Sequence, residues 1–240
     1  MLKRYPYVSE MVGNSATVNW GTDRSQATST ATWGAVANGT CTPSNDVSAS
    51  KSSITVGTSS EYQWTADLTF PGPGTYCYRV QLAGVDLLGT DPSPHVKTAT
   101  APGTPFSFAV VGQATTGEAN VMSQIDASPS SFVVSTGDSD NTGGSDTNYG
   151  DLTQGNVFPS QYLPKIGSRP IFAAQGNHGF TTNLPYLQNF PAQIAAQSSA
   201  GRNLQESYCC ISTMSGAHTY ASSWYAFDWG GARYYVLESR

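Results

Sequence analysis

Three things are scarce in this sequence: charged side chains, clusters of basic residues and long apolar runs. Charged residues make up only 11% of the 240-residue chain, whereas about a quarter is usual in soluble domains. The formal net charge is −5 and Lys and Arg nowhere cluster, so the basic patch typical of nucleic-acid-binding proteins is missing. No stretch approaches the roughly 20 consecutive apolar residues of a membrane-spanning helix. We therefore expect neither a nucleic-acid partner nor a membrane span.

The start of the chain, MLKRYPYVSEMV, also lacks the apolar segment of a secretory signal peptide. Ser, Thr, Gly and Asn take the place of charged residues, while Val, Ile, Tyr and Trp recur throughout. This composition is typical of a β-rich extracellular protein and differs from that of a disordered chain. We expect a secreted or extracellular location, with the sequence being either a mature form or a fragment whose true start is missing.

Cysteine is limited to four residues, and no pair of them has the spacing of a metal site. Cys41 and Cys77 both fall in the N-terminal β-rich region, which predicts a disulfide formed in an oxidising compartment. The adjacent Cys209 and Cys210 fit a vicinal disulfide, two free thiols or two bonds to other cysteines, and the sequence does not decide among these.

Residues 1–100 have the composition and turn spacing of a series of β-strands. Five segments are rich in Val, Thr, Tyr or Trp and are bounded by turn residues: 16–22, 30–36, 52–56, 61–70 and 75–83. Short strands at this spacing, with no convincing helix among them, predict an antiparallel β-sandwich. His95, in the Pro-bounded stretch DPSPHV, is expected in a surface loop.

The pattern changes after TATAPGTPFS (98–107), a linker of small residues and prolines. Three nearly continuous apolar runs follow, at 106–112, 130–138 and 169–178. The segment 118–128 has apolar residues at helical spacing, and 222–239 predicts a hairpin around WGGA. Apolar strands separated by helical or irregular segments indicate βαβ units with a parallel sheet. We therefore expect a partial α/β domain over residues 105–240.

Two of these apolar runs end in residues that can bind metals or substrate. GD closes the second run at Asp138, and GNH closes the third at Asn177 and His178. In open parallel sheets, ligands bind beyond the carboxyl ends of the strands. Asp and Asn supply hard oxygen ligands for divalent metals, and His178 is placed to reach a leaving group. Taken alone, Gly-Asn-His-Gly is also an ordinary turn sequence, so the rest of the chain decides the interpretation.

The strand–GD and strand–GNH motifs, preceded by a sandwich, resemble the calcineurin-like metallophosphoesterases, and within them the purple acid phosphatase-like branch. RYPYVSEMVGNSATVNWGTD resembles that branch's fibronectin-III-like N-terminal domain, and TPFSFAVVG resembles the first strand of its catalytic domain. The resemblance implies a fibronectin-III-like β-sandwich over residues 1–100 and a calcineurin-like metallophosphoesterase domain over 105–240.

The resemblance also implies an activity, which is the hydrolysis of a small phosphate ester by a metal-bound hydroxide. Two metal ions, drawn from Fe, Zn and Mn, are expected as cofactors. In this comparison Asp138 matches the carboxylate that bridges the metals, and Asn177 matches an amide ligand of the second metal. His178 matches the histidine that contacts substrate and stabilises or protonates the leaving group.

The sequence departs from the family pattern at several positions. Gln113 stands where the first motif has an aspartate, and Asn141 stands where the purple branch has a tyrosine ligand. Both late histidine motifs are absent, and His218, which matches neither, is expected at the surface. We expect poor activity or none from this chain alone, as for an N-terminal piece of a longer enzyme. The alternative is a non-catalytic binding or adhesion module with a degenerate phosphoesterase domain.

Overall fold

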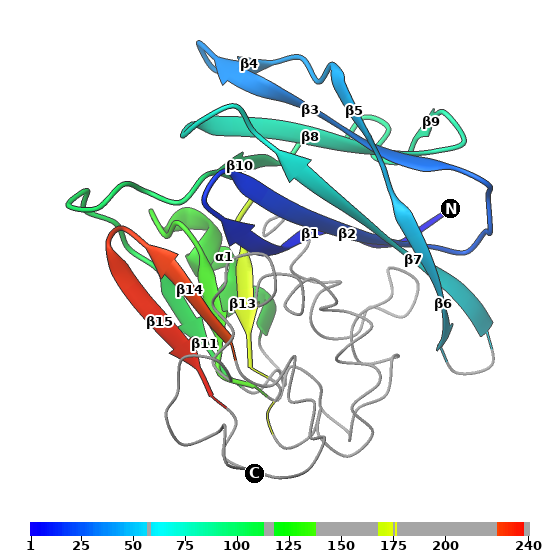
Figure 1. The fold of residues 1–240 in the computed structure, drawn as a ribbon. Coiled ribbons are helices and arrows are strands. Elements are labelled where there is room, and N and C mark those ends of the chain that lie inside the picture. Colours follow the sequence, from blue (N-terminus) through cyan, green and yellow to red (C-terminus); the bar gives the residue numbers. More distant parts are fainter. Residues whose placement is uncertain (57–58, 113–117, 138–167, 175, 177–224, 238–240) are drawn as a thin grey trace, which may run out of the picture.

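The computed structural model describes residues 1–56, 59–112, 118–137, 168–174, 176 and 225–237. This described part contains a β-sandwich, a small parallel sheet with one helix, and a β-hairpin (Figure 1). The sandwich is made by the first 97 residues, and the other two parts follow it in the chain.

Two antiparallel sheets form the sandwich. The first has the strand order β1-β2-β7-β6, and the second has the order β10-β8-β3-β4, with β5 beside β3 and β9 beside β8. The bounds are β1 Leu2–Val12, β2 Ser15–Thr22, β3 Ser29–Ala37, β4 Thr40–Cys41, β5 Asn45–Ser48, β6 Ser50–Val56, β7 Ser59–Thr69, β8 Thr75–Leu82, β9 Val85–Asp86 and β10 His95–Lys97. This is the strand order of an immunoglobulin-type sandwich, in which the first, second, fourth and fifth main strands share a sheet. The predicted sandwich is confirmed, and its five predicted strands appear within a residue or two of the expected positions.

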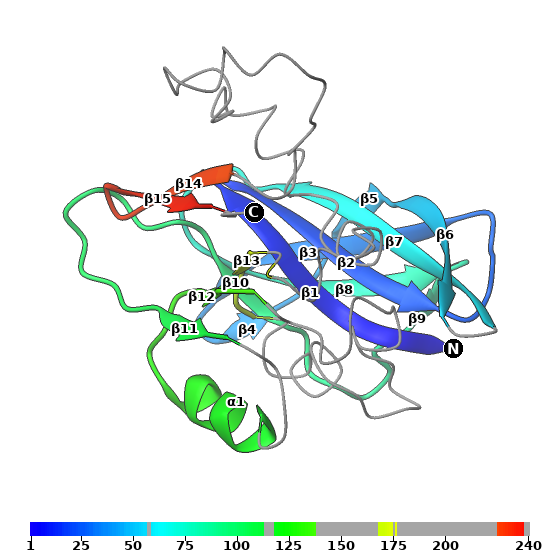
Figure 2. The same ribbon diagram turned by 90° about the horizontal axis from the view of Figure 1, so that it is seen from below.

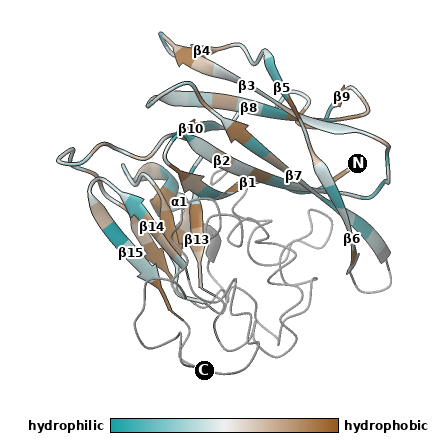
Figure 3. Cartoon of the chain, in the orientation of Figure 1, coloured by the Kyte–Doolittle hydropathy of each residue, from teal (hydrophilic) through white to brown (hydrophobic). Residues whose placement is uncertain are grey.

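The core of the sandwich lies between the two sheets. Trp20 on β2 and Trp64 on β7 are direct cross-strand partners, and both are fully buried. Tyr78 and Val80 on β8 approach from the opposite sheet and are also fully buried. Along β2, β7 and β8 hydrophobic and polar residues alternate in the sequence, and Figure 3 shows residues of both kinds on the strands of the sandwich. Period-2 alternation explains why the sequence indicates these strands.

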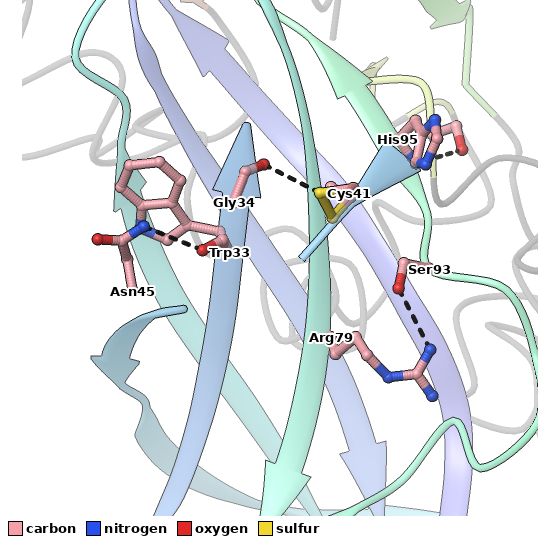
Figure 4. Close-up of a disulfide and its surroundings, with 9 residues drawn as sticks. Trp33, Gly34, Cys41, Asn45, Arg79, Ser93 and His95 are labelled. Atoms are coloured by element: carbon pink, nitrogen blue, oxygen red, sulfur yellow. Dashed lines mark hydrogen bonds between the residues drawn. A yellow bond between two sulfur atoms is a disulfide. The ribbon is translucent and has the colours of Figure 1, made fainter. Parts of the chain in front are cut away.

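The predicted disulfide between Cys41 and Cys77 is confirmed. The bond joins β4 to β8 with a Cα–Cα distance of 6.1 Å, although these two strands are separated in the sheet by β3. Gly34 of β3 is the cross-strand partner of Cys77, and its carbonyl oxygen lies 3.3 Å from the Cys41 sulfur (Figure 4). A side chain at Gly34 would overlap with the Thr42 carbonyl group, so glycine is what allows the chain to fold back closely enough for the bond.

His95 is exposed, as expected, but it belongs to a strand and not to a loop. It begins β10 and pairs with Cys77 of β8 (Figure 4). Its backbone N–H donates a hydrogen bond of 3.0 Å to the hydroxyl oxygen of Ser168. This bond connects the second sheet of the sandwich to the segment that leads into the parallel sheet.

The parallel sheet has the order β11-β12-β13, with β11 Ala109–Val111, β12 Val133–Ser135 and β13 Ile171–Ala173. Helix α1 (Glu118–Ala127) lies between β11 and β12 in the chain. The hairpin, β14 Tyr225–Trp229 and β15 Ala232–Val236, lies on the other side of the sheet from α1 (Figure 2). The expected helix, the parallel strands and the hairpin are therefore all present in the described part of the chain.

Aromatic side chains join the hairpin to the parallel sheet. Phe172 of β13 stacks on Phe227 of β14 with ring centroids 3.5 Å apart. Phe132, just before β12, lies 4.8 Å from Trp229 and 5.5 Å from Phe227. On the opposite side, Met122 of α1 is 1% exposed. β12 and β13 are mostly buried, which fits their continuous apolar sequences, whereas Val110 of the edge strand β11 is 58% exposed.

Candidate functional site

The carboxyl ends of the three parallel strands lie at one edge of the sheet. The last residues of the strands, Val111, Ser135 and Ala173, are paired with one another across the sheet. Hydrogen bonds continue just beyond them, because the Thr136 N–H donates to Val111 O and the Ala174 N–H donates to Ser135 O, both at 2.8 Å. The segments that leave the three strands therefore start side by side.

Each strand is followed by a glycine close to this edge. Gly137 and Gly176 have positive φ values of 108° and 72°, which favour glycine because it has no Cβ. Gly112 is confined for a different reason, because a Cβ there would overlap with the Thr136 hydroxyl oxygen. The three glycines allow the backbone to turn sharply at the edge where a ligand would bind.

The residues predicted for the site follow these glycines directly. Gln113 comes after Gly112, Asp138 comes after Gly137, and Asn177 and His178 come after Gly176. All four lie outside the described residues, as do Asn141, His218 and the Cys209–Cys210 pair. The structure brings the strand ends together. The roles of the four residues that follow the strands remain predictions.

No described group of three or more His, Cys, Asp or Glu residues is arranged to hold a metal ion. A metal at the carboxyl edge would therefore need ligands from outside the described residues, among which Asp138 and Asn177 are the predicted ones. These two residues offer a carboxylate oxygen and an amide oxygen, which is a donor set suited to hard divalent cations. The donor chemistry fits one such ion in part, and further ligands are needed to hold two transition metals tightly.

One residue that is not among those predicted for the site reaches this edge from the hairpin. The hydroxyl group of Tyr225, the first residue of β14, donates a hydrogen bond of 2.9 Å to the carbonyl oxygen of Ala173. The contact is buried. Nothing in the sequence could have indicated it, because an aromatic residue in a hairpin strand is normally a packing residue.

A pocket of about 410 Å³ lies at the other end of the sheet. Gly13 and Asn14 of the β1–β2 turn, Thr100 and Pro102 of the linker, and the hairpin residues from Asp228 to Gly231 contribute to its lining. The hairpin turn is fixed there by a hydrogen bond of 3.1 Å from the Gly230 N–H to Thr100 O. Because Tyr225 reaches the carboxyl end of β13 and Gly230 lies at the far end of β14, this pocket is separate from the candidate site.

The family resemblance depends on the sequence motifs alone, because the comparisons with known proteins add no match. Neither the scan of protein-family models nor the search of curated proteins gives a match to this chain. Among the described residues, no helix combines the length and the apolar character needed to cross a membrane.

Proposed function

We propose that this chain carries a metal-dependent phosphoesterase site of the calcineurin-like type, acting on small phosphate esters. The observation that supports the proposal is the register of the parallel sheet, in which Val111, Ser135 and Ala173 end side by side. The GD motif begins two residues beyond Ser135, and the GNH motif begins three residues beyond Ala173. Open α/β sheets bind their ligands at this position.

The site residues have distinct roles in this proposal. Asp138 and Asn177 would hold the metal, Asp138 through a carboxylate able to bridge two ions. When bound, divalent metal ions activate water and neutralise negative charge on the phosphate. Gln113 offers an amide oxygen in place of a carboxylate, which weakens the site because an amide carries no charge to offset that of the cations.

His178 would act on the leaving group. Its neighbour in the chain, Asn177, holds the metal, so the imidazole would lie beside the bound ester. A protonated imidazole can donate its proton to the departing alkoxide oxygen, which is the general-acid role that histidine fills near neutral pH. The other oxygens of the phosphate remain available to the metal.

A secreted or extracellular location is part of the same proposal. It is supported by the Cys41–Cys77 disulfide, because structural disulfides persist mainly in oxidising compartments. The low fraction of charged residues and the β-rich sandwich are consistent with it.

The alternative function is a non-catalytic binding or adhesion module. Gln113 in place of an aspartate favours this interpretation. The two functions differ in metal binding, because a degenerate domain has no need of Asp138 or Asn177 as ligands.

Calorimetric titration of the purified chain with Mn²⁺ and with Zn²⁺ distinguishes the phosphoesterase from the non-catalytic module. The proposal predicts binding that is lost in Asp138→Ala and weakened in Asn177→Ala. Asp126→Ala is the matched control, since Asp126 lies on α1 near the opposite edge of the sheet. There its carboxylate accepts a hydrogen bond of 3.2 Å from the Arg169 guanidinium group. Absence of metal binding, or binding that survives Asp138→Ala, would favour the non-catalytic module.

A further inference from the structure

The hairpin holds the end of β13 from which the GNH motif emerges. Tyr225 is 1% exposed, and its hydroxyl group donates a hydrogen bond of 2.9 Å to the Ala173 carbonyl oxygen. Ala173 is the last residue of β13, and Asn177 and His178 follow it closely in the chain. A buried hydroxyl group therefore fixes the backbone four residues before Asn177, the proposed metal ligand, and five before His178, the proposed acid.

The same strand end is held from the opposite direction by β12. The Ala174 N–H donates to Ser135 O at 2.8 Å, and Ser135 is 3% exposed. One residue before Ala173, the Phe172 ring is stacked on Phe227 of the hairpin at 3.5 Å. The carboxyl end of β13 thus has one neighbour in the sheet and one in the hairpin, and both contacts are shielded from water.

Tyr234 provides an internal comparison. It lies on β15 of the same hairpin and stacks on Phe227 with ring centroids 4.8 Å apart. Within the described part of the chain, however, its hydroxyl makes no hydrogen bond to β13. Tyr225 belongs to the hydrophobic core cluster and Tyr234 packs against that cluster, and of the two it is Tyr225 that binds the backbone at the strand end.

We propose that Tyr225 is a positioning residue for the site, and that its hydroxyl group holds the backbone at Ala173, the strand end after which Asn177 and His178 follow in the sequence. The inference rests on the proposed function, because it assigns Tyr225 to the metal site at this edge. A site of this kind needs its ligands held to within about 0.5 Å. Removing groups that orient metal ligands typically weakens metal affinity by about 10–100-fold.

The test compares Tyr225→Phe with Tyr234→Phe, since each variant loses one hydroxyl from the same hairpin. Amide hydrogen exchange is measured at Ala174, with Val18 in the core of the sandwich as the reference for global opening. Mn²⁺ affinity is measured on the same samples. In Tyr225→Phe we expect exchange at Ala174 to be about tenfold faster with Val18 unchanged, and Mn²⁺ affinity to fall by about tenfold. Tyr234→Phe should match the unmodified chain in both measurements.

The outcomes separate this inference from the function on which it rests. Unchanged exchange at Ala174 in Tyr225→Phe overturns the positioning role, as does exchange that rises equally at Val18, which would indicate a loss of global stability only. Equal Mn²⁺ affinity in Tyr225→Phe and the unmodified chain also overturns it. Failure of the unmodified chain to bind Mn²⁺ overturns the proposed function instead, and the exchange at Ala174 then decides whether Tyr225 holds the strand end.

Discussion

The guanidinium group of Arg4 on β1 crosses the backbone of β2 at Gly21 and binds Glu61 on β7. Its two terminal nitrogens donate hydrogen bonds of 2.9 and 2.8 Å to the same carboxylate oxygen. A Cβ added at Gly21 would lie 3.2 Å from the Arg4 Cβ, a tight contact, so glycine at this position gives Arg4 room to cross. Arg4 and Glu61 are 0% and 2% exposed, although they lie on the face of the first sheet that points away from the sandwich core.

This outward face is polar and buried along much of its length. Asn19 donates a hydrogen bond of 2.6 Å to the Ser9 hydroxyl, and Gln63 donates one of 2.9 Å to the Tyr7 hydroxyl. All four residues are buried, and β1 lies against β13 of the parallel sheet. The part of the first sheet that holds these residues is therefore buried on both faces, and hydrogen-bonded polar residues line the outward one.

Replacing Arg4 alone should destabilise the protein strongly. We expect Arg4→Met to lower the free energy of unfolding by about 3–5 kcal/mol, because it leaves the Glu61 carboxylate buried without its cation. The double variant Arg4→Met/Glu61→Leu should regain most of that loss. Urea denaturation gives these values, and Arg233→Met, which breaks an exposed pair with Asp228, should cost less than about 1 kcal/mol. Additive losses in the double variant would show that the two side chains are not coupled.

The Cys41–Cys77 disulfide should contribute through the chain entropy of the unfolded state. The bonded cysteines are 36 residues apart, and a loop of that length corresponds to about 3–4 kcal/mol. We expect the double variant Cys41→Ala/Cys77→Ala to remain folded as a sandwich with a lower urea midpoint. Reduction of the unmodified protein should give a similar loss. A midpoint unaffected by either treatment would contradict the expected contribution.

Asp86 should make the stability of the sandwich depend on pH at the acidic end. Partial burial alone would raise the pKa of this carboxyl, but the hydrogen bonds from the Arg79 side chain and the Leu88 N–H outweigh it and lower the pKa below its usual value. A lowered folded-state pKa means that the stabilisation is present above the unfolded-state pKa of about 3.9 and is lost as pH falls through the folded-state value.

The comparison for this prediction is Asp86→Asn, measured by urea denaturation from pH 7 down to about pH 2.5, which lies below the unfolded-state pKa. The stability difference between the two proteins should be small, since the pair is partly exposed, and constant above about pH 5. It should shrink toward zero as the pH falls. If the stability difference between the two proteins grew as the pH fell, the pKa of Asp86 would be raised on folding and not lowered, which would contradict this prediction.

Hydrolysis of an aryl phosphate by this chain should be slow or undetectable, even with added Mn²⁺ or Zn²⁺. The reason is the proposed ligand set, in which Asp138 and Asn177 are the donors and Gln113 stands where the family pattern has a carboxylate. Gln113→Asp should not restore turnover by itself, because one added carboxylate does not supply the missing histidine donors. Rapid metal-dependent turnover that disappears in Asp138→Ala would show that a further ligand, such as Asn141 or His218, completes the site.

Much of the sandwich could be predicted from the sequence, because β2, β3, β6, β7 and β8 are rich in Val, Thr, Tyr and Trp and are bounded by turn residues. β1 is not among the predicted strands, for a physical reason. Its sequence LKRYPYVSEMV contains Arg4 and Glu10, which normally indicate a solvent-exposed segment, yet both are buried. The register of β1 with β2 also shifts at three places, so the residues do not follow a simple period of two.

The parallel strands are shorter than predicted, for a related reason. The run 106–112 forms hydrogen-bonded strand only at Ala109–Val111, while Phe106 and Phe108 pack in the aromatic cluster before the strand begins. Aromatic packing therefore extends the apolar run beyond the paired residues, although Phe108 is 40% exposed. At the site, the sequence indicates which strand ends Asp138 and Asn177 follow. It could not indicate the Tyr225–Ala173 contact, because the two residues are 52 positions apart and a contact over that distance produces no local sequence pattern.

The most direct test of the metal site is to locate a bound paramagnetic ion by NMR. Mn²⁺ added to the isotopically labelled chain should broaden the amide signals of Gly112, Gly137 and Gly176, which lie at the carboxyl ends of the three parallel strands. Signals of the sandwich core, such as Val18, should remain sharp, and the broadening should disappear in Asp138→Ala. Broadening centred elsewhere, for example at the pocket beside Gly230, or broadening that persists in Asp138→Ala, would contradict a metal site at this edge of the sheet.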